Sequence, residues 1–131
     1  MPALVHDGKL VTESVPIALY LTDLFPKNRI GPQPGDPKRG EYLTWLAYYA
    51  GVMEPVLTGA AGREKVDHRL TQALRKGPYL LGTSFSAADI LLASLMQFSR
   101  NLVPSDEIFD QFLARVTARP AFARSTARTG D

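Results

Sequence analysis

Few residues in this chain have both the type and the spacing that chemistry needs. The 131-residue sequence has no cysteine, which excludes a thiolate nucleophile, a thiolate metal site and a disulfide framework. Its two histidines, His6 and His68, have no cysteine or carboxylate at ligand spacing, so we expect no metal site. Ser14 has no identifiable base nearby to activate its hydroxyl, which argues against a serine nucleophile.

Asp89 is an acidic residue inside an apolar segment, where a carboxyl group serves as a general base or as part of a helix cap. Ser86 and Asp89 have the spacing of a capping box, with Asp in place of the usual Glu or Gln. Phe85 and Ile90 occupy the two positions of a hydrophobic staple around it. The pattern favours the structural role for Asp89.

Glu13 and Ser14 also have two interpretations. A serine ahead of a helix is a common cap, and the acid beside it is then a solvated charge. Alternatively, the N–H groups of a helix start and a hydroxyl receive a carboxylate, while Glu13 pairs with an ammonium group. The residue types alone favour the cap.

A hairpin and a helix must position this pair. Asp7-Gly8 is typical of a type I′ turn, so strands are expected over 3–6 and 9–12. Apolar residues at helical spacing then predict a helix with Ser14 as its cap, which Pro26 ends. Four prolines and three glycines between positions 26 and 40 predict a linker or a long loop.

The rest of the chain has helical periodicity. The segment from Ser86 to Phe98 is apolar around its whole circumference and is expected at the centre of a bundle. Tyr48, Tyr49 and Met53 form a stripe that either packs in a core or lines a pocket for an apolar ligand. The other helices are expected over 37–57, over 63–76 and from a cap at Ser105 to Pro120.

Composition and charge limit the function classes. The formal net charge is +2, from 15 Lys and Arg against 13 Asp and Glu, which does not predict nucleic-acid binding. No apolar run reaches the roughly 20 residues of a membrane-spanning helix, and the N-terminus does not read as a signal peptide. We therefore expect a cytoplasmic protein that binds neither nucleic acid nor membrane.

Several short motifs occur in an order that is typical of one family. They are Pro2-Ala-Leu, Gly8-Lys-Leu, Glu13-Ser14 followed by Ile17 and Tyr20-Leu21, the Ser86-x-x-Asp89 box, and Arg119-Pro-Ala-Phe. Together they resemble the glutathione S-transferase family, and Trp45-Leu46 with Pro55 resembles its bacterial members. The resemblance covers nearly the whole chain.

The resemblance implies a mainly α fold. Residues 1–25 would be the strand–turn–strand–helix part of a thioredoxin-like domain, 26–36 the linker, and 37–131 the all-helical C-terminal domain. The first βαβα part of the thioredoxin-like domain is missing, so the chain is interpreted as truncated at its N-terminus. In the family that part carries the Tyr, Ser or Cys that lowers the pKa of the glutathione thiol, so no catalytic residue is assigned here.

The resemblance also implies a binding site and partners. Met1 and Pro2 match the residues at the cysteinyl part of glutathione, and Glu13 and Ser14 match the pair that holds its γ-glutamyl end. The implied reaction joins the thiol to an apolar electrophile, with Tyr48, Tyr49 and Met53 as the pocket for it, and the expected assembly is a homodimer. The alternative is a non-catalytic binding or interaction module. Glutathione is the one cofactor expected, as a substrate, with no metal.

Overall fold

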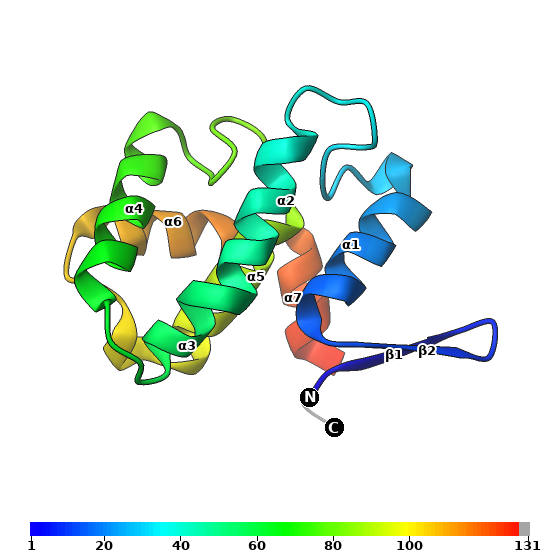
Figure 1. Ribbon diagram of the computed structural model, residues 1–131, viewed down its shortest axis with the longest axis horizontal. Helices are drawn as coiled ribbons and strands as arrows, with labels where there is room; N and C mark the ends of the chain where they lie inside the picture. The colour runs from blue at the N-terminus through cyan, green and yellow to red at the C-terminus, as the bar shows by residue number, and fades with distance from the viewer. Residues whose placement is uncertain (129–131) are drawn as a thin grey trace.

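The computed structural model describes residues 1–128 and begins with a β-hairpin (Figure 1). Strands β1 (Ala3–His6) and β2 (Lys9–Thr12) pair antiparallel, in a register that sets Ala3 opposite Thr12 and His6 opposite Lys9. Asp7 and Gly8 both have positive φ, 49° and 72°. The predicted strands and type I′ turn are therefore confirmed.

Helix α1 (Ser14–Leu24) follows β2 at once. The prediction of Ser14 as its cap is wrong, because Glu13 occupies the N-cap position and Ser14 is the first helical residue. After α1 the chain forms the 3₁₀ helix η1 (Pro26–Asn28) and then an irregular segment up to α2, as the prolines and glycines predict.

The helix expected over 37–57 is divided into three parts. Helix α2 (Arg39–Tyr48) runs into a π-helical turn, η2 (Tyr49–Met53), and then into α3 (Glu54–Leu57). The start lies two residues later than predicted, since Asp36 closes a turn instead: its Oδ1 accepts from Lys38 N at 2.8 Å. The π turn inserts i→i+5 geometry, which the apolar periodicity alone does not reveal.

Helix α4 (Arg63–Lys76) has the predicted bounds. Helix α5 (Ala87–Phe98) begins with the predicted capping box, and η3 (Arg100–Leu102) follows it. Helix α6 (Glu107–Thr117) is capped by Asp106, whose Oδ1 accepts from Ile108 N at 3.1 Å, so the prediction of Ser105 is off by one residue. Pro120 does not merely end a helix, because it also begins α7 (Pro120–Arg128).

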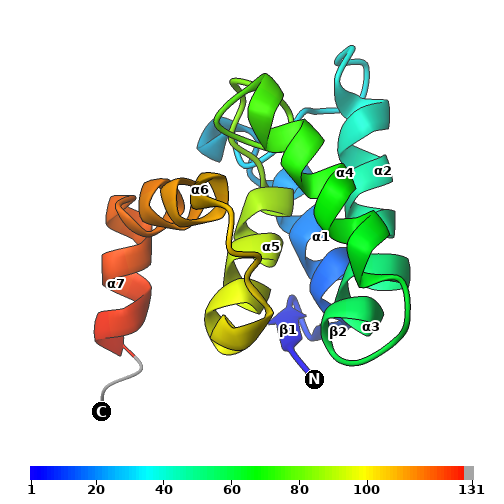
Figure 2. The same ribbon diagram turned by 90° about the vertical axis from the view of Figure 1, so that its left-hand side faces the viewer.

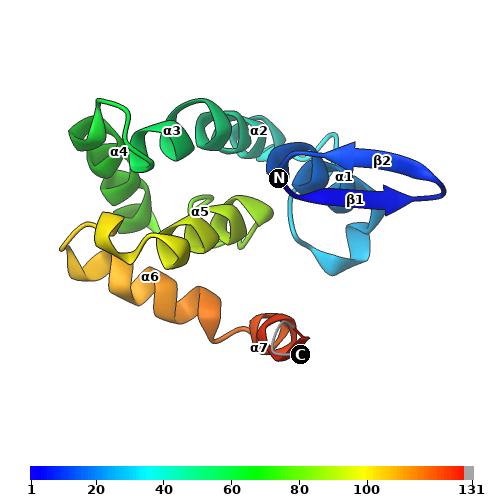
Figure 3. The ribbon, with the colours of Figure 1, turned by 90° about the horizontal axis from the view of Figure 1, so that it is seen from below.

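The helices are arranged around α5. Viewed from below, α4, α3, α2 and α1 form one row, α6 and α7 form another, and α5 lies between the two rows (Figure 3). Figure 2 shows α7 at the outer side of this bundle, joined to the end of α6. Helix α5 packs against α1, α2 and α6, which confirms its predicted central position. Its circumference is not wholly covered, however: Ile90 is 43% exposed and Phe98 is 89% exposed.

The core joins helices α2 to α6. Its fully buried large side chains include Tyr42 and Leu46 of α2, Leu70 of α4, and Phe109 and Phe112 of α6. Side chains of α1 pack against this core from the hairpin side. The predicted helical domain runs to residue 131, of which 129–131 lie outside the described residues. Within residues 1–128, no helix is long and apolar enough to cross a membrane.

Candidate functional site

Glu13 has the least favourable backbone conformation of the candidate residues. Its φ of 70° and ψ of 141° lie in a region that residues with a Cβ rarely occupy. It nevertheless begins α1, since its carbonyl oxygen accepts from Ile17 N at 3.1 Å. Its side chain is exposed and makes no hydrogen bond or ion pair within residues 1–128. The strain therefore holds a free carboxylate at the start of a helix.

The start of α1 is also open to a ligand. No side chain among the described residues caps it, and its first turn contains no acidic residue. The first N–H groups of an α-helix have no partner within the helix, and its dipole favours negative charge at this end. Ser14 stands here as the first helical residue, with its side chain half-buried. The arrangement suits a carboxylate at the N–H groups and an ammonium at Glu13.

The hairpin register brings Met1 and Pro2 to the same end as Glu13 and Ser14. Ala3 pairs with Thr12, so the residue before Ala3 and the residue after Thr12 leave the hairpin side by side. Met1 is 93% exposed and Pro2 is also exposed. Residues 1–128 contain no cis peptide bond. The four residues predicted to bind glutathione thus belong to one end of the hairpin.

Two kinds of contact hold the hairpin and the first turns of α1 in place. His6 Nδ1 lies 2.7 Å from the hydroxyl of Tyr20, and the two rings meet edge to face with their centres 5.8 Å apart. Val15, Ala18 and Leu19 pack against the helical core. The hairpin is therefore tied to α1, and α1 is tied to the core.

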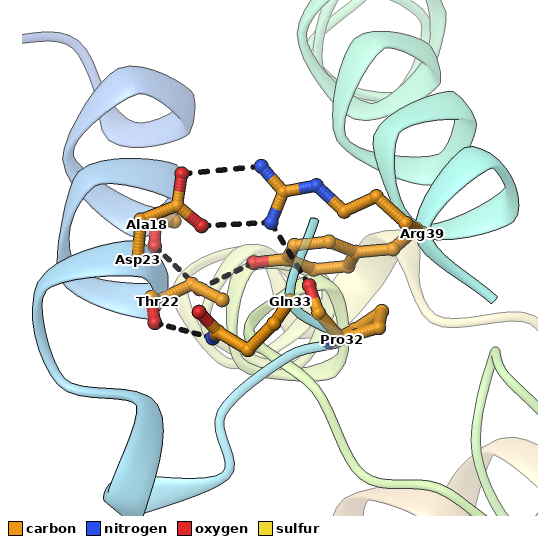
Figure 4. A network of polar contacts seen from close by, with 7 residues as sticks. Ala18, Thr22, Asp23, Pro32, Gln33 and Arg39 are labelled. Atoms are coloured by element: carbon orange, nitrogen blue, oxygen red, sulfur yellow. Dashed lines mark hydrogen bonds and ion pairs between the residues drawn. The ribbon is translucent and has the colours of Figure 1, made fainter. Parts of the chain in front are cut away.

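The last turn of α1 is held by an ion pair with α2 (Figure 4). The Arg39 guanidinium binds the Asp23 carboxylate through two hydrogen bonds, of 2.7 and 3.1 Å, and also donates to Pro32 O at 2.9 Å. The hydrogen bond with Asp23 raises the pKa of Arg39. This ion pair joins α1, the linker and α2 at one point.

A second contact lies beside this ion pair. The buried Thr22 hydroxyl meets the hydroxyl of Tyr42 at 2.7 Å and donates to Ala18 O, while Gln33 Nε2 donates to Thr22 O at 2.8 Å (Figure 4). Burial raises the pKa of Tyr42. Gly31 allows this close packing, because a Cβ there would lie 2.8 Å from Tyr42 Cζ and 2.9 Å from Thr22 Cγ2.

The sequence patterns do not predict the polar network at the end of α1. The hydroxyl group of Tyr42 meets Thr22, which lies 20 residues away in the sequence, so no local pattern indicates the contact. Arg39 and Asp23 are residue types common on protein surfaces, and they lie 16 positions apart on either side of the linker. The sequence of an irregular linker does not indicate which side chains it brings together. The one available signal is the concentration of proline and glycine, which predicts a linker but not its contacts.

The stripe proposed as a pocket belongs mainly to the core. Tyr49 and Met53 are buried in it, at 5% and 0% exposure. Tyr48 is half-buried, and the Arg69 guanidinium carbon lies 4.0 Å above its ring centre. None of the three lines the largest of the described cavities, of about 570 Å³, between the linker, the start of α5 and α7. These contacts favour the packing interpretation of the stripe.

Asp89 acts as a structural residue. One carboxylate oxygen accepts from Leu80 N at 2.8 Å, and the other accepts from Ser86 N at 2.8 Å and from the Ser86 hydroxyl at 3.3 Å. Burial raises the pKa of Asp89 to about 6, against the effect of these hydrogen bonds. The carboxylate is fully buried with all its described partners in the protein, so it has no position from which to act on a ligand.

Two histidines remain among the candidate residues. His68 is exposed on α4, and His6 is 3.8 Å from the Asp7 carboxylate, with Tyr20 as its other partner. Within the described part of the chain, no group of three or more His, Cys, Asp or Glu side chains is placed to hold a metal ion.

A hairpin and helix followed by a helical bundle are similar to a large part of the fold of solved glutathione S-transferases. The structure resembles that of BphK, a bacterial glutathione S-transferase, with a TM-score of 0.82 and 26% identity over 100% of this chain and 74% of that chain. The glutathione transferase of Methylococcus capsulatus gives a TM-score of 0.82 and 25% identity, over 99% of this chain and 73% of that one. The fold of this chain is thus similar to that of bacterial glutathione S-transferases, and the chain spans about three quarters of the length of these two.

One curated relative also matches in sequence. A segment of 49 residues is 52% identical to protein LigF of Sphingobium sp. strain NBRC 103272 / SYK-6, over 37% of this chain and 19% of LigF. The match therefore spans about a fifth of the length of that relative. The structure of LigF, a beta-etherase, has the same fold, with a TM-score of 0.71 and 24% identity. No protein-family model matches the sequence.

Proposed function

We propose that this chain carries part of a glutathione site, with Glu13 and Ser14 binding the γ-glutamyl end and Met1 and Pro2 next to the cysteinyl part. The observation that carries the proposal is the backbone of Glu13, strained at φ 70° beside an uncapped helix start. Strained residues of this kind gather at sites of function. A γ-glutamyl group has the carboxylate and the ammonium that this arrangement suits.

The reaction class proposed for the protein is transfer of the glutathione thiol to an apolar electrophile. The thiolate attacks an electrophilic carbon, the bond from that carbon to its leaving group breaks, and the thiol proton goes to solvent or to a base. None of the described residues is assigned to lowering the thiol pKa. Solved relatives support the ligand: structures of a sphingomonad enzyme and of a Sulfitobacter homologue contain bound glutathione. We place the protein in the cytoplasm.

A second candidate is a binding or interaction module without turnover. Strand β1 pairs only with β2 among the described residues, and Val5 and Leu10 are exposed at 68% and 65% on one face of the hairpin. An open strand edge with apolar side chains beside it favours pairing with another strand. The partner proposed is a second copy of the chain, which makes a homodimer.

Calorimetric titration with glutathione tests the proposal. We expect saturable binding that Glu13→Ala abolishes and that Glu64→Ala, which removes an exposed acid from α4, leaves unchanged. The dipeptide Cys-Gly lacks the γ-glutamyl group and should give no heat. Binding of Cys-Gly equal to that of glutathione, or no glutathione binding at millimolar concentration, rejects the site. A thiol-transfer assay with an activated aryl halide then separates the enzyme from the binding module.

A further inference from the structure

Helix α1 has the candidate site at one end and the polar network at the other. Glu13 and Ser14 stand at its start, and Thr22 and Asp23 lie in its last turns. Its 11 residues make it about 16 Å long, at 1.5 Å per residue. A tilt of about 10° around the last turn, which lies about 13 Å from the first residue, therefore moves that residue by about 2 Å. Hydrogen bonds to a ligand do not survive a shift of that size.

The network opposes such a tilt at two separate points. The Asp23–Arg39 pair is bidentate, and two parallel N–H···O bonds fix direction as well as distance. Arg39 is itself held, because its side chain is only 16% exposed and donates to Pro32 O. The Thr22–Tyr42 contact is the second point, inside the core. Two points on one helix turn define the direction of α1 relative to α2.

We propose that Arg39, acting through Asp23, is a positioning residue for the glutathione site. Arg39 contacts no ligand in this proposal. It fixes the direction of α1, and the direction of α1 determines where Glu13 and Ser14 lie relative to the helical domain. The inference rests on the proposed function, because it concerns the same site. It adds two residues that no motif of the sequence indicates.

The chain offers a matched control for the test. Arg63 Nε binds both oxygens of Asp67 at 2.8 and 3.0 Å on α4, with both side chains partly exposed and far along the chain from α1. Glutathione affinity is measured by calorimetry for Arg39→Gln, Arg39→Lys and Asp67→Asn. We expect Arg39→Gln to raise Kd about tenfold or more, Arg39→Lys to give an intermediate value because it keeps the charge but not the fork, and Asp67→Asn to keep the parent Kd. An unchanged Kd for Arg39→Gln overturns the proposal.

Amide hydrogen exchange separates this inference from the proposed function. If the parent chain gives no glutathione heat, the proposed site fails, and the positioning role is then judged on α1 itself. Arg39→Gln should speed exchange at Ile17 and Ala18, whereas Leu92 of α5 keeps its rate and Asp67→Asn changes neither. Equal exchange in α1 of the parent and Arg39→Gln rejects the positioning role. Acceleration of α1 and α5 together also rejects it, because the ion pair then serves only global stability.

Discussion

Replacing Glu13 by glycine should separate folding from binding. A non-glycine residue at φ 70° and ψ 141° costs about 1–3 kcal/mol, which glycine does not incur. Against this, glycine loses about 0.4–1 kcal/mol through the greater freedom of the unfolded chain. The Glu13 carboxylate has no partner within the described residues, so no contact is lost. Glu13→Gly should therefore leave the free energy of unfolding unchanged or raise it by up to about 2.5 kcal/mol.

The assay is urea unfolding combined with glutathione calorimetry. Gln72→Gly is the control, because Gln72 is exposed inside α4 and glycine there should cost about 1 kcal/mol. Glu13→Gly should lose glutathione binding while its free energy of unfolding stays the same or rises. This is the result expected if Glu13 serves ligand binding and not the stability of the fold. A loss of stability in Glu13→Gly as large as that in Gln72→Gly refutes the strain argument. Parent-like glutathione binding refutes the role of the carboxylate.

Two further predictions concern the packing that supports the site. Gly31→Ala should lower the free energy of unfolding by about 1–3 kcal/mol, because the added Cβ would lie less than 3 Å from atoms of Tyr42 and Thr22. The control is Gly40→Ala in α2, which has open space around it and should raise the free energy of unfolding by up to about 1 kcal/mol. Equal urea midpoints for the two variants contradict the prediction. Asp89 has a folded pKa raised to about 6, so its contribution to stability is present below pH 4 and is lost as the pH rises through 6. The difference in free energy of unfolding between the parent and Asp89→Asn should therefore fall by about 2 kcal/mol between pH 4 and pH 7 in urea unfolding. A difference that grows over this range means that the hydrogen bonds to the carboxylate outweigh the effect of burial.

The sequence predicted the elements whose signals are local. Asp7-Gly8 fixes the hairpin because both positions need positive φ, and the strands on either side follow from it. The bounds of α4 follow from a regular apolar stripe and the Gly77-Pro78 stop. The capping box at Ser86 and Asp89 depends on a spacing of three residues and was readable for the same reason.

The sequence could not choose between neighbouring caps or find contacts between distant segments. Ser105 and Asp106 are both good caps, and which one lies at the N-cap depends on how the preceding turn directs the chain into α6. A proline can follow the end of one helix or begin the next, because it has no N–H for a preceding helix and its fixed φ suits a first helical position. The Asp23–Arg39 pair and the strain at Glu13 arise only after α1 has packed, and no local pattern encodes them.

The strained backbone of Glu13 is held from both sides. A strained backbone persists only where the surrounding structure fixes it from both sides. Before Glu13, the pairing of Ala3 with Thr12 fixes the strand; after it, the Ile17 N–H bond to Glu13 O and the packing of α1 fix the helix. If folding alone decided this position, glycine would serve better, since the Glu13 side chain contacts no partner in the described chain. A glutamate held there at a cost, with no partner for its carboxylate among the described residues, is therefore consistent with the proposed glutathione site.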